Sequence, residues 1–539
     1  MVSKKNNLYF FFYGCLCCLL SIFVVQNFSL ISFPRISNTD SNKNQDQLSF
    51  QKIEEMYNLI LSTYYEPVDT ISILNSMLES ILESVDPHTS YFSATQHNRE
   101  NEEMMGNFYG IGIQFSIFQD TIVVIKVLPD GPSENTELMA GDRITHVDGD
   151  KITGPMLSNE EVLNRLRGMQ GTKVQLTAFS HDKKEKNIEL YRDEIPLNSI
   201  ASSYIIDDNI AYLKIDKFSA TTYSEFINHI NSLVNNGAEK MIIDLRGNTG
   251  GYLDQSVAIA DELLDFGLDI VSVKGDFRDE VKYKSTYQGQ LSNYPLIILI
   301  DEFSASASEI LAGAIQDNNR GEIVGRTSFG KGLVGEEFSL GDGSVLRLTV
   351  ARYFTPSGRC IQKDFPNSDS YPIDITMNYS PSHKIDYHNK ADSANIFYTL
   401  DGDTVLGGGG INPDYYIQEE NNFSSEESLN FIYDNFSKLD ELTFQFIDSK
   451  RSNLKDDADD FRIFLNNNIY ILWASCIDLF KQTHNLQEMD YMKIELQQQL
   501  ELLSARNFLS TQEFVYFVNQ EDQMLKTAVK LLKSENYEF

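Results

Sequence analysis

The protein has 539 residues, of which 42% are hydrophobic and 12% aromatic, and its formal net charge is −34 at pH 7. A chain of this length exceeds what one hydrophobic core supports, so several domains are expected. The apolar content excludes a wholly disordered protein. The negative charge excludes sequence-independent binding of DNA or RNA, which requires clustered lysine and arginine side chains.

An uncharged apolar run extends from Leu8 to Val25 and follows Lys4 and Lys5. As a helix it measures roughly 27 Å, close to the roughly 30 Å hydrocarbon thickness of a bilayer. Lysines before such a run favour a cytoplasmic N-terminus with the rest of the protein outside. We therefore expect residues 1–47 to be a membrane anchor and polar tether, with the body on the periplasmic side of a bacterial inner membrane. The alternatives are a cleaved signal peptide, although no A-x-A sequence follows the run, or a lipoprotein site at Cys15.

The remaining chain divides by its apolar pattern. Residues 48–105 have apolar positions at helical spacing. Residues 106–193 contain short β-type runs separated by glycines, typical of a small β-barrel with two helices. Residues 194–420 alternate buried strands with amphipathic helices, and residues 421–539 return to helical spacing. The sequence therefore predicts an α+β multidomain protein with helical regions at both ends. Expected helices cover 50–64, 71–84 and 223–234, and expected strands cover 121–127, 173–179, 211–215, 241–245, 296–300 and 345–350.

A serine-rich segment, DEFSASASE at 301–309, follows one predicted buried strand and opens a predicted helix. Ser306 and Glu309 have the spacing of a capping box, S-x-x-E, which stabilises a helix by about 1 kcal/mol. Taken alone, the segment is better explained as a helix cap than as a catalytic site.

Lys331 stands between Gly330 and Gly332, a context that favours neither helix nor strand. A lysine acts as a general base only if its pKa falls from about 10.4 toward roughly 7–8, which requires burial in a dry pocket. A single loop lysine is more often an exposed surface residue. No P-loop motif is completed here.

A third segment, DLRGNTGG at 244–251, comes directly after another predicted buried strand. The backbone N–H groups of such a glycine-rich turn suit an oxyanion or a phosphate. An ordinary strand-to-helix turn explains the segment equally well when it is considered alone.

In combination, and in their order along the chain (244–251, 301–309, 330–332), the three segments resemble the carboxy-terminal processing peptidases, also called tail-specific proteases, a family of Ser–Lys enzymes. The resemblance extends from about residue 50 to residue 414. Several motifs in family order are far more specific than any one of them. The further motifs are DPHTSY at 86–91, YGIGI at 109–113, FGKG at 329–332, TPSGR at 355–359 and GINPD at 410–414.

This resemblance implies a serine endopeptidase with an α/β protease core at residues 194–420. It implies that Ser306 is the nucleophile and that Lys331 is its general base. No metal or other cofactor is expected, because no Cys/His cluster has zinc spacing and no HExxH motif occurs. The other implied site residues are Gly250, Gly251 and Ala307 for the oxyanion hole and Asp317 in a supporting role.

The segment at residues 106–193 is similar to a PDZ domain. PDZ domains bind chain ends by adding the peptide as a strand at a sheet edge, while a backbone loop holds the terminal carboxylate. The expected partners are therefore proteins or peptides with free C-termini. The loop residues expected to bind substrate are Gly110, Ile111, Gly112 and Ile113.

One position departs from the family pattern. The family usually carries a glutamine four residues after the lysine, where this sequence has Gly335. Glycine offers no side-chain hydrogen bond, although Glu336 or Glu337 would reach the lysine if the strand were shifted by one residue. The alternative function is therefore a catalytically impaired, membrane-tethered PDZ binding or scaffold protein. The helices of residues 421–539 are candidates for homo-oligomer formation or adaptor binding.

Overall fold

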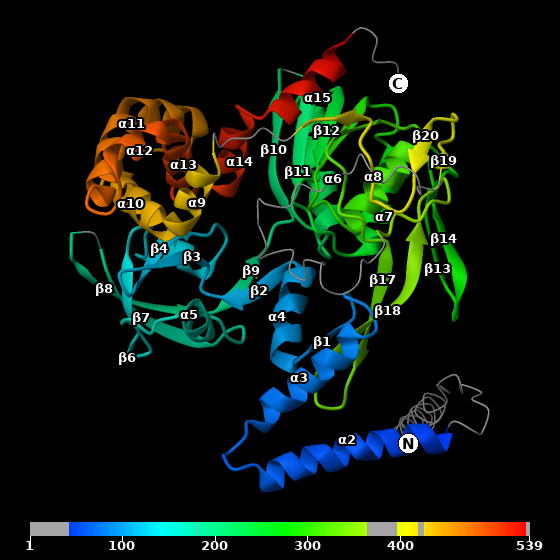
Figure 1. Cartoon of the computed structure of the whole chain (residues 1–539). Helices are drawn as coiled ribbons and strands as arrows, with labels where there is room; N and C mark the ends of the chain where they lie inside the picture. The colour runs from blue at the N-terminus through cyan, green and yellow to red at the C-terminus, as the bar shows by residue number, and fades with distance from the viewer. Residues whose placement is uncertain (1–42, 181, 208, 364–395, 419–424, 535–539) are drawn as a thin grey trace, which may run out of the picture. The chain divides into compact units, whose positions relative to one another are not determined.

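The computed structural model describes residues 43–180, 182–207, 209–363, 396–418 and 425–534. The expected membrane anchor lies outside these residues. The chain divides into two units, the first ending at Ile81 and the second beginning at Leu82 (Figure 1). The mixed fold of helices and sheets expected from the sequence is confirmed.

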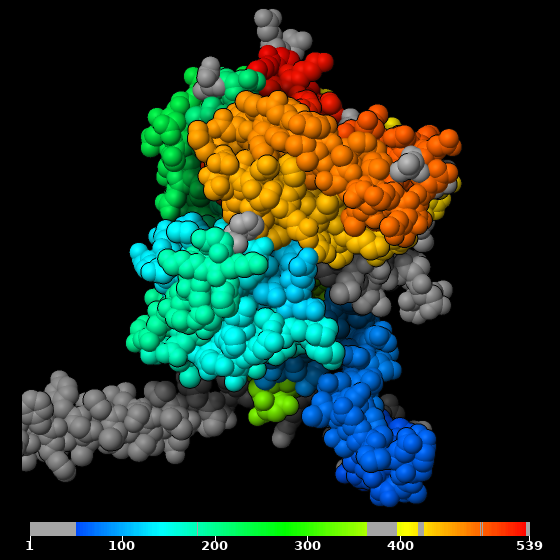
Figure 2. Space-filling model, turned by 90° about the vertical axis from the view of Figure 1, so that its left-hand side faces the viewer, coloured from blue at the N-terminus to red at the C-terminus, as the bar shows by residue number. Residues whose placement is uncertain are grey.

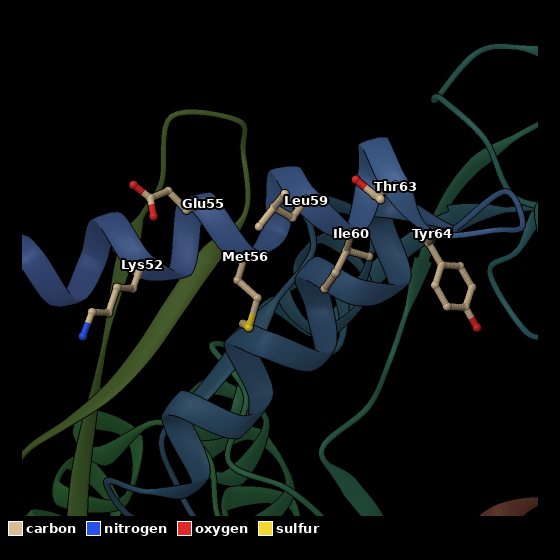
Figure 3. Close-up of a pocket in the computed structure, with 7 residues that line it drawn as sticks. All are labelled: Lys52, Glu55, Met56, Leu59, Ile60, Thr63 and Tyr64. Carbon is tan, nitrogen blue, oxygen red and sulfur yellow. The ribbon is translucent and has the colours of Figure 1, made fainter.

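The first unit contains helix α2 (Lys43–Thr63) and most of α3 (Thr70–Glu83). Helical spacing predicted both helices, but the apolar side chains of α2 remain exposed: Phe50 by 71%, Met56 by 53% and Leu59 by 63%. A shallow hollow of about 490 Å³ runs along α2, and Figure 3 shows the side chains that line it. They are Lys52, Glu55, Met56, Leu59, Ile60, Thr63 and Tyr64.

Residues 107–196 form the β-rich part of the second unit. Its main sheet has the strand order β3-β4-β5-β7-β8, with β6 paired to β5, so β3 is an edge strand. The alternating side chains Val174, Leu176 and Ala178 of β7 are buried against Val162 and Leu166 of helix α5. The elements are β2 (Asn107–Gly110), β3 (Ile113–Phe118), β4 (Thr121–Val127), η1 (Pro132–Asn135), β5 (Arg143–Val147), β6 (Asp150–Lys151), α5 (Asn159–Leu166), β7 (Lys173–Phe179), β8 (Glu185–Tyr191) and β9 (Asp193–Pro196).

A second sheet, in the order β10-β11-β12-β15-β16-β21, forms the centre of the α/β core. Its strands are parallel except for the antiparallel pair β10–β11. Helices α6, α7 and α8 cover one face, and the C-terminal helix α15 covers the other. Both faces are therefore buried, as the short apolar runs predicted. The elements are β10 (Ile200–Ile206), β11 (Ile210–Ile215), α6 (Thr222–Asn235), β12 (Lys240–Asp244), α7 (Leu253–Leu263), β15 (Leu296–Ile300), α8 (Ala307–Asp317), β16 (Glu322–Gly325), β21 (Tyr415–Tyr416) and α15 (Gln523–Lys533).

A third sheet has the order β1-β18-β13-β14, with β17 also paired to β18. Its long strand β18 thus lies between a strand from the start of the second unit and strands from the α/β core. The elements in and beside this sheet are β1 (Ser90–Phe92), α4 (Ala94–Met105), β13 (Asp269–Gly275), β14 (Arg278–Lys284), β17 (Leu333–Ser339), β18 (Val345–Phe354), β19 (Ile396–Tyr398) and β20 (Thr404–Leu406).

The C-terminal helices form a bundle with its own apolar core. The bundle also contacts the β-rich part of the unit: the rings of Phe118 and Phe444 stack at 4.3 Å, and Arg143 pairs with Asp448 at 2.8 Å. Figure 2 shows the bundle, in orange, lying against that part, in cyan. Helix α11 is long and apolar enough to cross a membrane by length and composition alone, but Phe461 and other apolar residues on it are buried in the bundle core. The helices are α9 (Glu426–Asp434), α10 (Phe436–Asp448), η4 (Arg451–Asn453), α11 (Ala458–Phe480), α12 (Leu486–Tyr491), α13 (Lys493–Arg506) and α14 (Thr511–Asn519).

Candidate active site

Ser306 lies in the connection between β15 and α8, immediately before the first residue of the helix. Its backbone has φ 56° and ψ −112°. A residue with a side chain rarely adopts a positive φ, and such strain concentrates at functional sites. Every residue of α8 is buried, so the helix holds the strained turn firmly in place.

Glu309, on the first turn of α8, joins the serine turn to the lysine loop. Its buried carboxylate accepts the backbone N–H of Ser306 at 2.8 Å and that of Lys331 at 2.9 Å. It also accepts the N–H of Gly330 at 2.7 Å and the hydroxyl of Ser328 at 2.6 Å. Burial raises the pKa of Glu309, and the four hydrogen bonds act against that rise. The carboxylate of the expected capping box is therefore also the link between the two predicted catalytic residues.

Tyr353, on β18, forms a second link between these segments. Its buried hydroxyl lies 3.2 Å from the carbonyl oxygen of Ser306 and also contacts the carbonyl oxygen of Lys331. The two backbone segments are thus held by a shared carboxylate on their N–H groups and by a shared hydroxyl on their carbonyl groups.

The lysine itself is mostly enclosed. Burial lowers the pKa of Lys331 below its ordinary value of 10.5, and the positive charge of Arg347 lowers it further. The charges of Glu309, Asp86 and Glu100 act in the opposite direction. The net shift favours the neutral amine, which is the form that accepts a proton.

The DPHTSY segment lies against β18 near this lysine. The Asp86 carboxylate accepts the backbone N–H of His88 at 2.7 Å and the hydroxyl of Thr349 at 3.2 Å. Burial and the charge of Lys331 lower the pKa of His88 to about 4. The imidazole is therefore neutral near pH 7 and adds no positive charge beside the lysine.

The glycine turn after β12 packs directly on the serine turn. A Cβ atom on Gly250 would lie 2.7 Å from Ser306 Cβ, and one on Gly251 would lie 2.1 Å from the Phe218 carbonyl oxygen. Both positions therefore require glycine. The N–H of Gly250 donates to Asn248 Oδ1 at 2.8 Å. The N–H groups of Gly251 and Ala307 donate to no group among the residues that the structure describes.

Asp317 lies at the far end of α8, away from the serine. Its carboxylate pairs with Arg359 at 2.7 Å, and both side chains are fully buried. The same carboxylate accepts the hydroxyl of Ser357 at 2.6 Å. Asp317 thus anchors the TPSGR loop to the core helix.

The glycine loop of the β-rich part leads into the edge strand β3. Gly112 has φ +74°, and a Cβ atom there would lie 2.9 Å from the Cα of Gly131. The N–H groups of Ile111 and Gly112 have no acceptor in the described part of the chain. Arg167 lies beside the loop: its guanidinium stacks at 4.4 Å on Phe108 and bonds Glu102 at 2.9 Å. The loop and the edge strand together have the features of a carboxylate-binding peptide site.

Comparisons with known proteins address the identity of these parts. Residues 209–369 match peptidase family S41, and residues 110–191 match the PDZ domain. The carboxy-terminal-processing protease of Bartonella bacilliformis is 34% identical over 333 residues, covering 60% of this chain and 75% of that protein. The carboxy-terminal processing protease CtpA of Bacillus subtilis is 30% identical over 345 residues, covering 64% and 72%. The solved structure of a photosystem II D1 C-terminal processing protease aligns at 24% identity over 69% of this chain and 87% of that one, with a TM-score of 0.34.

This chain belongs to the carboxy-terminal processing protease family. It is a serine-type peptidase with a PDZ domain. The resemblance inferred from the sequence motifs is thereby confirmed.

Gly335, the position expected from the sequence to depart from the family pattern, lies on β17 beside a register shift, opposite Thr349. A Cβ atom there would lie 3.2 Å from Arg347 Cγ, so a larger side chain requires Arg347 to move. The two following glutamates do not replace the missing glutamine. Glu336 bonds Arg278, and Glu337 bonds Arg347 at 2.7 Å and His97 at 3.0 Å.

Sequence reasoning missed three residues of this site. The sequence pattern explains Glu309 only as a helix cap, although its position three residues after the predicted nucleophile Ser306 is a visible signal. Tyr353 lies on strand β18, and no neighbouring residue in the sequence distinguishes it from an ordinary core tyrosine. Arg167 follows the last residue of helix α5 and precedes Gly168, which is a weak sequence signal. Its relation to the Gly110–Ile113 loop is visible only in the structure.

Proposed function

We propose that this protein is a serine endopeptidase that cleaves peptide bonds with Ser306 as nucleophile and Lys331 as general base. The observation that carries the proposal is the Glu309 carboxylate, which accepts the N–H groups of both residues at 2.8 and 2.9 Å. A nucleophile and a base must be held in one geometry, because they act as a unit. The lowered pKa of Lys331 supports the same assignment.

In the proposed reaction, the neutral Lys331 amine takes the proton of the Ser306 hydroxyl while the serine oxygen attacks the substrate carbonyl carbon. The oxygen that becomes negative is stabilised by backbone N–H groups of Ala307 and the Gly250–Gly251 turn. Gly251 and Ala307 are the stronger candidates, since the Gly250 N–H already donates to Asn248. Lys331 then returns the proton to the leaving amine, and water hydrolyses the acyl-serine ester with the lysine again as base.

The PDZ domain is proposed to select substrates by their free C-termini. The peptide would add as a strand to the edge of β3, with its carboxylate at the loop of Gly110, Ile111, Gly112 and Ile113. The Arg167 side chain supports the proposal, because its Cγ lies 3.8 Å from the position a Cβ atom on Gly110 would take. Its guanidinium, now paired with Glu102, is the nearby positive group that a terminal carboxylate would compete for.

Amidating the substrate C-terminus is the experiment that tests this function. The unmodified enzyme should cleave an unfolded protein with an apolar free C-terminus. The amidated form, which lacks the terminal charge, should bind and be cleaved about tenfold less well. Binding of the acid form without any cleavage would favour the alternative of an impaired scaffold protein, for which Gly335 is the supporting observation. Equal cleavage of both forms would contradict the PDZ role and leave the dyad in place.

The pH dependence of turnover tests the lysine base. Because the protonated amine cannot accept the serine proton, kcat/KM should rise with pH, by about tenfold per unit below the pKa of Lys331. Arg347→Gln removes a positive charge near the lysine, so the rise should move to higher pH, whereas Arg347→Lys, which retains the charge, should move it less. A profile that is flat from about pH 5 to 9, with chemistry limiting, would contradict a lysine base.

We also propose that residues 8–25 hold the enzyme at a membrane with its catalytic body outside the cytoplasm. The support is the length of the uncharged run and the two lysines before it. Removing residues 1–42 should transfer the activity from the membrane fraction to the soluble fraction. Activity that remains soluble with the intact chain would contradict an uncleaved anchor.

A further inference from the structure

The C-terminal helix α15 is part of the catalytic core rather than an appendage. Four of its residues, Met524, Leu525, Ala528 and Leu532, are buried against the second face of the sheet that carries β12 and β15. Lys240, at the start of β12, donates to the Leu532 carbonyl at 2.6 Å. The helix therefore covers the second face of the sheet whose strands β15 and β12 lead into the serine turn and the glycine turn.

Asp522 caps this helix and also reaches the glycine turn. One carboxylate oxygen accepts the backbone N–H of Leu525 at 2.6 Å, as a helix N-cap does. The other oxygen pairs with Arg246 Nη1 at 2.5 Å. The two functions use different oxygens of the same carboxylate.

Arg246 is the second residue after β12 and begins the glycine turn. Its side chain is held from the other side by Asp244, which accepts Nη2 at 2.6 Å and Nε at 2.9 Å. Although burial acts against it, the charges of Arg246 and Lys214 lower the pKa of Asp244 well below its usual range. Arg246 therefore lies between two carboxylates, one at the end of β12 and one that caps a helix 276 residues later in the chain.

The turn that follows Arg246 has little freedom relative to the nucleophile. The Gly247 N–H donates to Asp301 at 3.0 Å, and the Asn248 carbonyl accepts the N–H of Ala305 at 3.0 Å. Gly250 then packs against Ser306. Because Arg246 directly precedes Gly247 in this turn, a displacement of Arg246 is expected to disturb these contacts and shift the turn's N–H groups. In the proposed reaction such donors act only at about 2.7–3.1 Å from the oxyanion.

We propose that Asp522 is a positioning residue for the oxyanion turn, acting through Arg246. The inference rests on the proposed peptidase function. It gives the C-terminal region a role in the chemical step, in addition to closing the sheet.

Asp522→Asn is the informative variant, because asparagine retains the N-cap oxygen but removes the charge that faces Arg246. We expect kcat to fall about tenfold with KM nearly unchanged, a smaller loss than the 10²–10³ caused by deleting an oxyanion donor outright. The affinity for a peptide boronic acid, which mimics the tetrahedral intermediate, should fall in parallel, while the affinity for the cleaved product peptide should not change. Each kcat is calculated per active molecule, from the fraction of protein that a fluorophosphonate labels at completion. Misfolded protein therefore does not lower the measured kcat.

The matched control is Lys533→Met, which removes the exposed pair with Asp207 at the other end of the same helix. It should leave kcat and boronic-acid affinity unchanged. An Asp522→Asn enzyme with the parent kcat, or one whose losses are equalled by Lys533→Met, would overturn the positioning role. A parent protein that cleaves nothing would instead overturn the proposed function, and the positioning role with it.

Discussion

Alanine at Ser306, or alanine at Lys331, is expected to abolish cleavage of an unfolded protein substrate. Each variant should lose at least about a thousandfold in kcat, because nucleophile and base act as a unit and removing either leaves only binding and oxyanion stabilisation. The Glu309 and Tyr353 contacts attach to backbone groups of the two residues, so the fold of the site should survive both substitutions. The measurement is turnover on one substrate, with thermal unfolding recorded for each variant.

The neighbouring serines are the matched controls. Ser308→Ala removes a hydrogen bond to the Asn248 carbonyl. Ser304→Ala removes one to the Leu245 carbonyl and also the acceptor of the Asp301 N–H. Each loss costs about 1 kcal/mol and should leave most of the turnover in place. Robust turnover by Ser306→Ala would refute the assignment of the nucleophile, whereas equal inactivity of all three serine variants would indicate a purely structural effect.

Glutamine at Glu309 is expected to have the second-largest effect, although the side chain keeps its shape. Four donors point at this carboxylate, and an amide presents only one acceptor oxygen and adds two donors of its own. Leaving a buried donor without a partner costs about 1–3 kcal/mol. We expect roughly 2–4 kcal/mol of lost stability and at least about a hundredfold loss of kcat, because the serine turn and the lysine loop lose their common anchor.

Glu302→Gln is the control for this prediction. Glu302 lies in the same connection but pairs with Arg326 at a partly exposed position, so its loss should cost less than about 1 kcal/mol and leave turnover unchanged. Equilibrium unfolding and single-turnover kinetics separate the two consequences for Glu309. A Glu309→Gln enzyme with the parent rate would show that the shared carboxylate does not set the geometry of the dyad.

The catalytic assignment was accessible from sequence because it depends on local patterns that recur in a fixed order. The serine-rich segment at 301–309 and the turn at 244–251 each follow a short apolar strand, and the lysine stands between two glycines. The strand at 173–179 was likewise predictable from the alternation of apolar residues along β7, whereas the pairing of the PDZ strands is known only from the structure. Such patterns survive in sequence because residues close in the chain determine helix and strand periodicity.

What the sequence alone determined, therefore, is the protease family, the order of the domains and the two residues proposed to carry the chemistry. Only the tertiary structure decided what holds those residues together. The Glu309 carboxylate accepts the N–H groups of Ser306 and Lys331, and the Tyr353 hydroxyl contacts their carbonyl oxygens. Asp522, at the start of the C-terminal helix, pairs with Arg246. The tertiary structure also decided that α15 closes the catalytic sheet, while the apolar side chains of α2 in the first unit remain exposed. The physical reason is that periodicity records which face of an element is apolar but not what covers it, since that partner is set by long-range packing of segments far apart in the chain.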